Sequence, residues 1–139
     1  ILDFLQSRQD SALQELCQFL RIPSVSADSA YAPQMRACAD WVQQAMTDAG
    51  LQSTIYPTPG HPIVYGERLV DPALPTVLIY GHYDVQPGDP LDLWKTSPFE
   101  PIVRDGRMLG RGAADDKGQI LIHLAALEAL KRDLEEERR

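Results

Sequence analysis

Cysteine is scarce in this sequence: Cys17 and Cys38 occur without a C-x-x-C pair and without a histidine close by in the chain. This pattern argues against a cysteine-based metal site. We interpret both residues as small buried apolar side chains in a reducing compartment, because free cysteine is often buried and disulfides are rare in the cytosol. The sequence therefore predicts a cytoplasmic protein, and it leaves open whether the two thiols form a disulfide.

Long apolar runs and basic clusters are also missing. No stretch of about 18 apolar residues occurs, so no transmembrane helix is predicted. No basic segment followed by an apolar one indicates a signal peptide. The chain has 13 Lys and Arg against 20 Asp and Glu, a net charge of −7. Because nucleic-acid-binding surfaces cluster Lys and Arg, we expect neither nucleic acid nor a membrane as a partner.

Three motifs of common enzymes are absent as well. Gly110 and Gly112 match the start of the dinucleotide motif G-x-G-x-x-G, but its third position is Asp115, whose carboxylate would repel a pyrophosphate. The chain has neither a phosphate-binding loop G-x-x-x-x-G-K-[ST] nor a G-x-S-x-G nucleophile elbow. These absences argue against dinucleotide binding, P-loop chemistry and serine hydrolysis of that type.

The chain has the length of one domain. Its 139 residues, 44% of them hydrophobic, can bury one ordinary core. It begins at Ile1 rather than at a methionine, so we expect it to be a portion of a longer protein.

The most informative stretch is Val77–Val85, with the sequence VLIYGHYDV. Its apolar start is too short for a helix, which indicates a strand buried on both faces in the middle of a parallel sheet. We therefore predict an α/β fold with a central mixed, mostly parallel sheet flanked by helices. His82 and Asp84 lie two residues apart, so in an extended chain they point to the same side, at the sheet edge where α/β proteins bind ligands.

A second motif, Gly110–Gly118, has the sequence GRGAADDKG. Asp115 and Asp116 follow a glycine-containing turn and precede an apolar-periodic segment, which predicts a helix from near Asp116 to the end of the chain. One aspartate is fully explained as a helix N-cap. A second aspartate beside it is not, so a functional role for this pair is favoured.

The other elements follow from local patterns. We predict two further helices, two strands and a hairpin, over residues 3–21, 32–49, 52–56, 63–68 and 101–109. The hairpin turn would be Asp105–Gly106, and a proline-rich loop over 86–98 would form the rim of the site. We interpret His61, Trp94 and His123 as packing or solvent-facing residues rather than ligands or substrate contacts.

His82, Asp84 and Asp115 together fit a metal site. Zinc accepts imidazole nitrogen and carboxylate oxygen, a carboxylate usually orients a ligand histidine, and one carboxylate can bridge two ions. We therefore predict His82 and Asp115 as metal ligands and Asp84 as the catalytic-site residue that orients His82. Such a centre acidifies bound water and polarises a carbonyl group, which suits amide hydrolysis. Mn²⁺ or Co²⁺ could use similar ligands.

The two motifs together resemble the dinuclear zinc peptidase and deacylase family, which includes carnosinase-type dipeptidases, glutamate carboxypeptidases, aminoacylases and succinyl-diaminopimelate desuccinylase. The segments 20–26 (LRIPSVS) and 94–101 (WKTSPFEP) are similar to its dipeptidase branch. The resemblance covers nearly the whole chain and implies a zinc-exopeptidase-like catalytic domain. It implies His82 as a terminal ligand of one zinc, Asp115 as the bridging ligand of both, and a cis peptide bond between Asp115 and Asp116.

The chain also departs from the family pattern. The family carries a Glu-Glu pair after this helix, one glutamate as general base and one as ligand, followed by another acidic ligand, a second histidine and a lid domain. None of these can be placed in the sequence, and Glu135–Glu137 lie in the wrong context. We therefore expect residues 1–139 to be the N-terminal portion of a metallopeptidase catalytic domain, without the lid and dimerisation domain and inactive alone. The resemblance allows a homodimer for the full-length parent.

Two alternatives to a dipeptidase stay open. The first is an N-acyl-amino-acid deacylase, which shares both motifs, because the choice between a dipeptide and an N-acyl amino acid depends on residues outside this chain. The second is a truncated or engineered structural fragment without catalysis, which the charge-rich segment 131–139 motivates. A Glu-Glu pair encoded downstream of Arg139 would favour the enzyme.

Overall fold

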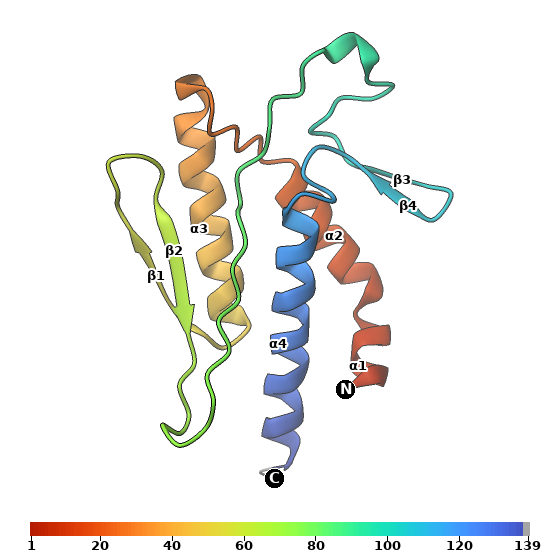
Figure 1. The fold of residues 1–139 in the computed structure, drawn as a ribbon. Coiled ribbons are helices and arrows are strands. Elements are labelled where there is room, and N and C mark those ends of the chain that lie inside the picture. Colours follow the sequence, from red (N-terminus) through yellow and green to blue (C-terminus); the bar gives the residue numbers. More distant parts are fainter. Residues whose placement is uncertain (138–139) are drawn as a thin grey trace.

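The computed structural model describes residues 1–137, and Arg138 and Arg139 of the predicted charged tail lie outside them. Helices and strands are mixed along the chain (Figure 1), which confirms the α/β class, as an incomplete domain. In chain order the elements are α1 Leu2–Ser7, α2 Gln9–Leu20, η1 Ser29–Tyr31, α3 Ala32–Asp48, β1 Gln52–Tyr56, β2 Ile63–Glu67, η2 Leu91–Leu93, β3 Ile102–Arg104, β4 Arg107–Leu109 and α4 Lys117–Glu137. None of the helices in this part of the chain combines the length and hydrophobicity of a membrane span.

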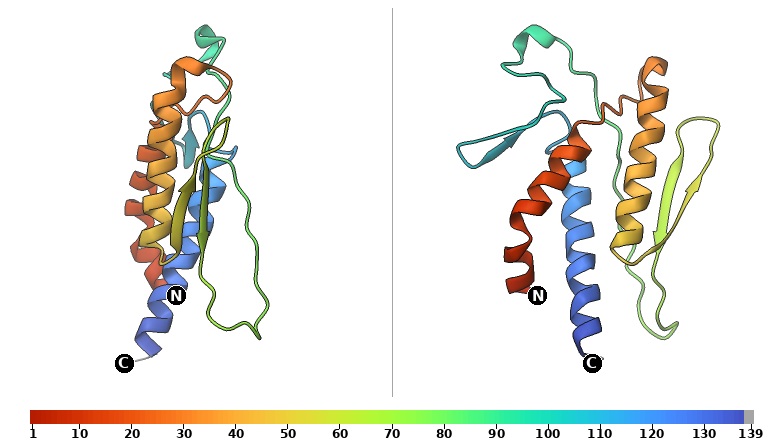
Figure 2. Two further views of the ribbon diagram at one scale, coloured as in Figure 1. Left: turned by 90° about the vertical axis from the view of Figure 1, so that its left-hand side faces the viewer. Right: turned by 180° about the vertical axis from the view of Figure 1, so that it is seen from behind.

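The helices carry the core. α2, α3 and α4 lie side by side (Figures 1 and 2). Phe19, Cys38 and Val42 form the centre of the core, and the ring of Phe19 stacks on Trp41 with centroids 4.2 Å apart. Burying each large apolar side chain stabilises the fold by about 1.5–3 kcal/mol. Both cysteines are free thiols, Cys38 fully buried and Cys17 half-buried, so the prediction of buried apolar side chains is confirmed for Cys38.

The first helix is broken where the sequence predicts a continuous one over 3–21. Arg8 lies between α1 and α2 with ψ −3°, far from the roughly −42° of an α-helix. Its guanidinium contacts Glu15 Oε1 at 3.0 Å and Glu128 Oε2 at 2.5 Å. The break therefore lies where Arg8 joins the beginning of the chain to α4.

The two hairpins confirm the turn predictions. β1 pairs with β2 in antiparallel register, with Thr54 opposite Tyr65, and this hairpin packs on α3. β3 and β4 flank Asp105–Gly106, whose φ angles of 52° and 71° are those of a two-residue hairpin turn with both central residues left-handed.

The prediction of a buried strand over Val77–Val85 is wrong for its apolar part. In the described residues the sheets are the two antiparallel hairpins, and parallel pairing is limited to the bridge between Val25 and Val85. Val77, Leu78 and Tyr80 are 80%, 87% and 85% exposed. The segment is extended, but a buried central strand needs neighbouring strands and cover on both faces. Here the helices lie on one side of it (Figure 2, left).

Candidate metal centre

Three segments that are far apart in the sequence meet at the candidate centre: the loop after α2, the segment His82–Val85, and the turn before α4. The loop after α2 runs parallel to His82–Val85 through the bridge between Val25 and Val85. In that contact Val85 N–H donates to Ser24 O at 2.8 Å. Backbone pairing therefore places the ends of α2 and of the extended segment together.

Two glycines permit the close approach of these segments. A Cβ at Gly81 would lie 2.8 Å from Ile120 Cγ1 and 2.9 Å from Asp116 Oδ2, so a larger residue would push the extended segment off the start of α4. Gly112 has a φ of 86°, and a Cβ there would lie 2.7 Å from Val85 Cγ1. The glycine-rich motif thus serves backbone packing against the site segment rather than binding of a phosphate.

Lys117 anchors the beginning of α4 from inside. Its side chain is fully buried, and Nζ donates to Phe19 O at 2.9 Å and to Ile22 O at 2.7 Å. Nζ also lies 4.8 Å from the centroid of the Phe19 ring, a cation–π distance. Burial lowers the pKa of Lys117. Since Lys117 directly follows Asp115 and Asp116, this anchor fixes the position of the backbone that carries the two carboxylates.

The three residues predicted for the site come together. His82 Nδ1 lies 3.0 Å from Asp84 Oδ1, and His82 Nε2 lies 2.9 Å from Asp115 Oδ1. The side chains of His82 and Asp84 are 39% and 35% exposed, whereas that of Asp115 is 80% exposed. The Nε2 side of the imidazole therefore opens to solvent, and the Nδ1 side faces the protein. The peptide bond between Asp115 and Asp116 is cis, as the resemblance implies.

The imidazole of His82 is tuned by its two carboxylates. Burial lowers the pKa of His82, but the hydrogen bonds with Asp84 and Asp115 outweigh that effect and raise the pKa above its ordinary value. A carboxylate only accepts hydrogen bonds, so a protonated His82 donates to both neighbours. A metal ion would have to displace the Nε2 proton and take its place between that nitrogen and the carboxylate of Asp115.

Two further residues make contacts at the centre that the sequence did not assign. Asp116 Oδ2 accepts the backbone N–H of His82 at 3.0 Å, so this carboxylate fixes the site segment. Ser26 Oγ donates to Asp84 Oδ2 at 2.5 Å. Asp116 was signalled by its place in the Asp-Asp pair, whereas nothing in the loop sequence singles out Ser26.

His82 Nε2 and Asp115 Oδ1 could serve as two of the ligands of a zinc-type metal ion. Two ligands at roughly 2.0–2.1 Å in tetrahedral geometry lie about 3.3–3.4 Å apart. His82 Nε2 and Asp115 Oδ1, at 2.9 Å, need only a small opening to reach that spacing. Among the residues whose side chains the structure describes (1–135), no group of three or more His, Cys, Asp or Glu is arranged to hold an ion. This chain therefore supplies two candidate ligands of a centre that needs more.

The other singled-out side chains lie outside the centre. His61 Nε2 contacts Ser26 O at 2.9 Å, and the guanidinium of Arg111 lies 5.4 Å from the centroid of the Trp94 ring. His123 is exposed on α4. The interpretation of these three residues as packing or solvent-facing thus agrees with their surroundings.

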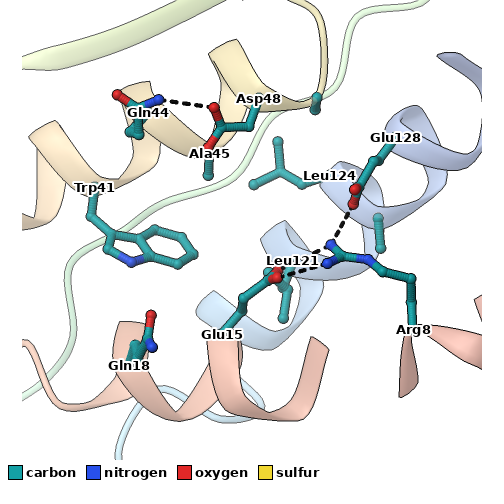
Figure 3. A pocket seen from close by; sticks show the side chains of 12 residues that line it. Arg8, Glu15, Gln18, Trp41, Gln44, Ala45, Asp48, Leu121, Leu124 and Glu128 are labelled. Carbon is teal, nitrogen blue, oxygen red and sulfur yellow. Dashed lines mark hydrogen bonds and ion pairs between the residues drawn. The ribbon is translucent and has the colours of Figure 1, made fainter. Parts of the chain in front are cut away.

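A pocket between α2, α3 and α4 lies apart from these residues (Figure 3). Arg8 lines it together with Glu15 and Glu128, and dashed lines in the figure show its guanidinium contacting both carboxylates. Trp41 and Leu124 provide apolar walls. Because these charges already pair with one another and none of the predicted site residues lines the pocket, we do not regard it as the functional site.

Comparisons with known proteins find matches to peptidases. Residues 78–139 match the model of Peptidase family M20/M25/M40. The chain is 39% identical to the Cys-Gly metallodipeptidase dug1 of Schizosaccharomyces pombe, over 93% of this chain and 29% of that protein. It is 49% identical to the succinyl-diaminopimelate desuccinylase of Nitrosospira multiformis, over 40% of this chain and 15% of that enzyme.

Solved structures give the same result. The crystal structure of human carnosine dipeptidase 1 superposes with a TM-score of 0.85 and 28% sequence identity, over 93% of this chain and 30% of that one. These matches confirm the resemblance seen in the two motifs and its extent over nearly the whole chain. The chain spans about a third or less of the length of these relatives.

Proposed function

We propose that the complete protein is a metal-dependent hydrolase of amide bonds, of the dipeptidase type, because residues 78–139 match the model of Peptidase family M20/M25/M40. In this proposal residues 1–139 form the N-terminal portion of its catalytic domain, and the lid and dimerisation domain lies outside them. The observation that carries the proposal is the convergence of His82 Nε2 and Asp115 Oδ1, 2.9 Å apart, on the solvent-facing side of the imidazole.

The proposed roles follow from the contacts of each side chain. His82 Nε2 and the carboxylate of Asp115 would hold the metal, with zinc as the proposed ion and Asp115 shared between two ions. A bound zinc pair supplies a polarised carbonyl and an acidified water. Asp84 would accept a hydrogen bond from Nδ1–H of His82, which leaves the Nε2 lone pair for the metal. Mn²⁺ and Co²⁺ accept the same ligands.

The proposed substrate is a dipeptide. Two of the matched proteins are named as dipeptidases, one for Cys-Gly and one for carnosine, and their matches extend over 93% of this chain. The second candidate is an N-acyl amino acid. The desuccinylase match supports it with higher identity over a shorter span.

We propose the cytoplasm as the location. The supporting observation is that Cys17 and Cys38 are both free in the described structure, as expected in a reducing compartment.

The first test is a zinc titration of this chain by calorimetry. Wild type, His82→Ala and Asp115→Ala are compared, with His123→Ala as the matched control because His123 is an exposed histidine outside the centre. We expect zinc binding that is lost in both site variants and kept in the control. Binding that survives both site substitutions would place the metal elsewhere and overturn the assignment.

The second test separates the three functions and uses the full-length protein loaded with zinc. A dipeptidase cleaves Cys-Gly or β-Ala-His faster than N-succinyl amino acids, and a deacylase shows the reverse order. In either enzyme Asp115→Ala should abolish turnover. If neither substrate class is hydrolysed, the structural-fragment alternative is favoured instead.

A further inference from the structure

Ser26 holds the carboxylate of Asp84 from the side opposite His82. Its hydroxyl donates to Asp84 Oδ2 at 2.5 Å, while the other oxygen, Asp84 Oδ1, lies 3.0 Å from His82 Nδ1. Each carboxylate oxygen thus has its own partner. The carboxylate cannot rotate about its Cβ–Cγ bond without breaking one of these two contacts.

The position of Ser26 is itself fixed. The neighbouring residue Val25 is buried and bridges to Val85. The hydroxyl of Ser24, two residues earlier, donates to Tyr83 O at 2.7 Å. On the other side, His61 Nε2 contacts Ser26 O at 2.9 Å. The loop after α2 is therefore bound to the site segment at successive positions, and Ser26 is the position that reaches a site side chain.

We propose that Ser26 is a positioning residue of the metal centre, which selects the protonated nitrogen of His82. In neutral His82 one ring proton is shared between two competing carboxylates, Asp84 at Nδ1 and Asp115 at Nε2. By aiming Oδ1 at Nδ1, Ser26 favours the Nδ1–H tautomer and leaves Nε2 free as a ligand atom. This inference rests on the proposed metal-dependent function, but its first consequence concerns the metal-free protein.

Three variants separate positioning from packing. Ser26→Ala removes the hydroxyl that reaches Asp84, and Ser26→Thr retains a hydroxyl at the same position. Ser24→Ala is the matched control, since it removes a hydroxyl from the same loop whose partner is the backbone of Tyr83 rather than Asp84. Circular dichroism and a melting curve show that each variant is folded.

The first readout is the tautomer of His82 in the metal-free chain. Nitrogen-15 NMR of the imidazole is recorded above the pKa of His82, and the signal is assigned by its loss in His82→Gln. We expect mainly Nδ1–H in wild type, Ser26→Thr and Ser24→Ala. In Ser26→Ala we expect the ratio of Nδ1–H to Nε2–H to fall about threefold or more, as loss of a hydrogen bond to a charged group predicts. An unchanged ratio in Ser26→Ala would overturn the inference.

The second readout is the zinc dissociation constant. We expect Ser26→Ala to weaken binding about tenfold, at the lower end of the effect of outer-shell partners, while Ser26→Thr and Ser24→Ala stay near wild type. Equal weakening in Ser24→Ala would contradict a specific role of Ser26. If zinc binds independently of His82 and Asp115, the proposed metal centre fails, whereas a tautomer shift in Ser26→Ala would still support the positioning role.

Discussion

In the proposed metal centre, His82 is the residue at which a proton and the metal would compete. Asp84 contacts its Nδ1 and Asp115 its Nε2, and the Asp115 side of the ring is the more exposed one. A proton on Nε2 and a metal on Nε2 exclude each other, so each weakens the binding of the other. The chemistry of the proposed centre would therefore depend on which of the two occupies that nitrogen.

The raised pKa of His82 predicts a pH dependence of stability in the metal-free chain. A histidine whose pKa is higher in the folded state stabilises the fold most below its unfolded pKa of about 6.5 and loses this contribution as the pH rises through the folded value. We expect the free energy of unfolding, measured by urea titration, to fall over that interval. His82→Gln should lack this component, and an identical pH profile in that variant would contradict the prediction.

Cys38 is predicted to react with iodoacetamide more slowly than Cys17. It is fully buried, and burial raises the pKa of its thiol, so little reactive thiolate is accessible. In a Cys17→Ser variant we expect iodoacetamide to label Cys38 at least about tenfold more slowly in the native state than in denaturant. A Cys38→Ser variant serves as the comparison, because Cys17 is half-buried. Rapid native labelling of Cys38 would show that the core opens.

Sequence reasoning singled out candidate residues that lie together in the structure, but it did not find a partner that contacts them from a distant part of the chain. His82, Asp84 and Asp115 stand out because they follow apolar or glycine-rich patterns. The partner of Asp84 is Ser26, 58 positions away in the chain. A serine in a loop has no pattern that reveals such a contact, so tertiary structure is needed to find it.

At the scale of elements, the start of α4 depends on a buried lysine. Lys117→Met should leave the carbonyls of Phe19 and Ile22 without their donor, and we expect a loss of about 2–4 kcal/mol in the free energy of unfolding. Lys131→Met is the matched control, because Lys131 donates to Asp48 O at an exposed position of the same helix. Its loss should be within about 0.5 kcal/mol. Similar losses in a denaturant titration would argue against the anchor.

In the turn before α4, Gly112→Ala is expected to cost more stability than Gly106→Ala in the hairpin turn. Gly112 and Gly106 both have positive φ, but a Cβ at Gly112 would meet Val85, whereas nothing lies within 4 Å of one at Gly106. Gly106→Ala should cost about 1–2 kcal/mol for its backbone conformation alone. Gly112→Ala should cost about 1–3 kcal/mol more through overpacking. Thermal unfolding of both variants measures the two losses of stability. Equal losses would show that the turn shifts to accommodate the added methyl group without strain.

Elements that depend on local patterns were predicted well. α3 runs over Ala32–Asp48, within one residue of the predicted end, because its apolar period and the following glycine are both local signals. The Asp105–Gly106 hairpin is confirmed for the same reason. The apolar part of Val77–Val85 was predicted wrongly as a buried strand because burial depends on neighbours, and an apolar run says nothing about which chain segments will provide them.

At the scale of the whole molecule, the uncovered extended segment predicts self-association. Exposed apolar residues on an extended, unpaired segment are typical of surfaces that associate, and Leu78 is 87% exposed there. We expect analytical ultracentrifugation to show concentration-dependent association of the isolated chain. Leu78→Lys should weaken it, whereas Leu2→Lys, at a position 80% exposed on α1, should not. Association unchanged by Leu78→Lys would locate the contact elsewhere.

The anchor formed by Lys117 also has a consequence in time. Its carbonyl partner on Phe19 lies 98 positions earlier in the chain, and a ribosome adds roughly 5–20 residues per second. During synthesis, Lys117 is therefore added roughly 5–20 s after Phe19, and only then can it donate to the carbonyl at the end of α2. Any cofactor loading that needs Asp115 beside His82 begins only after α4 has emerged, so the centre is among the last parts of this chain to mature.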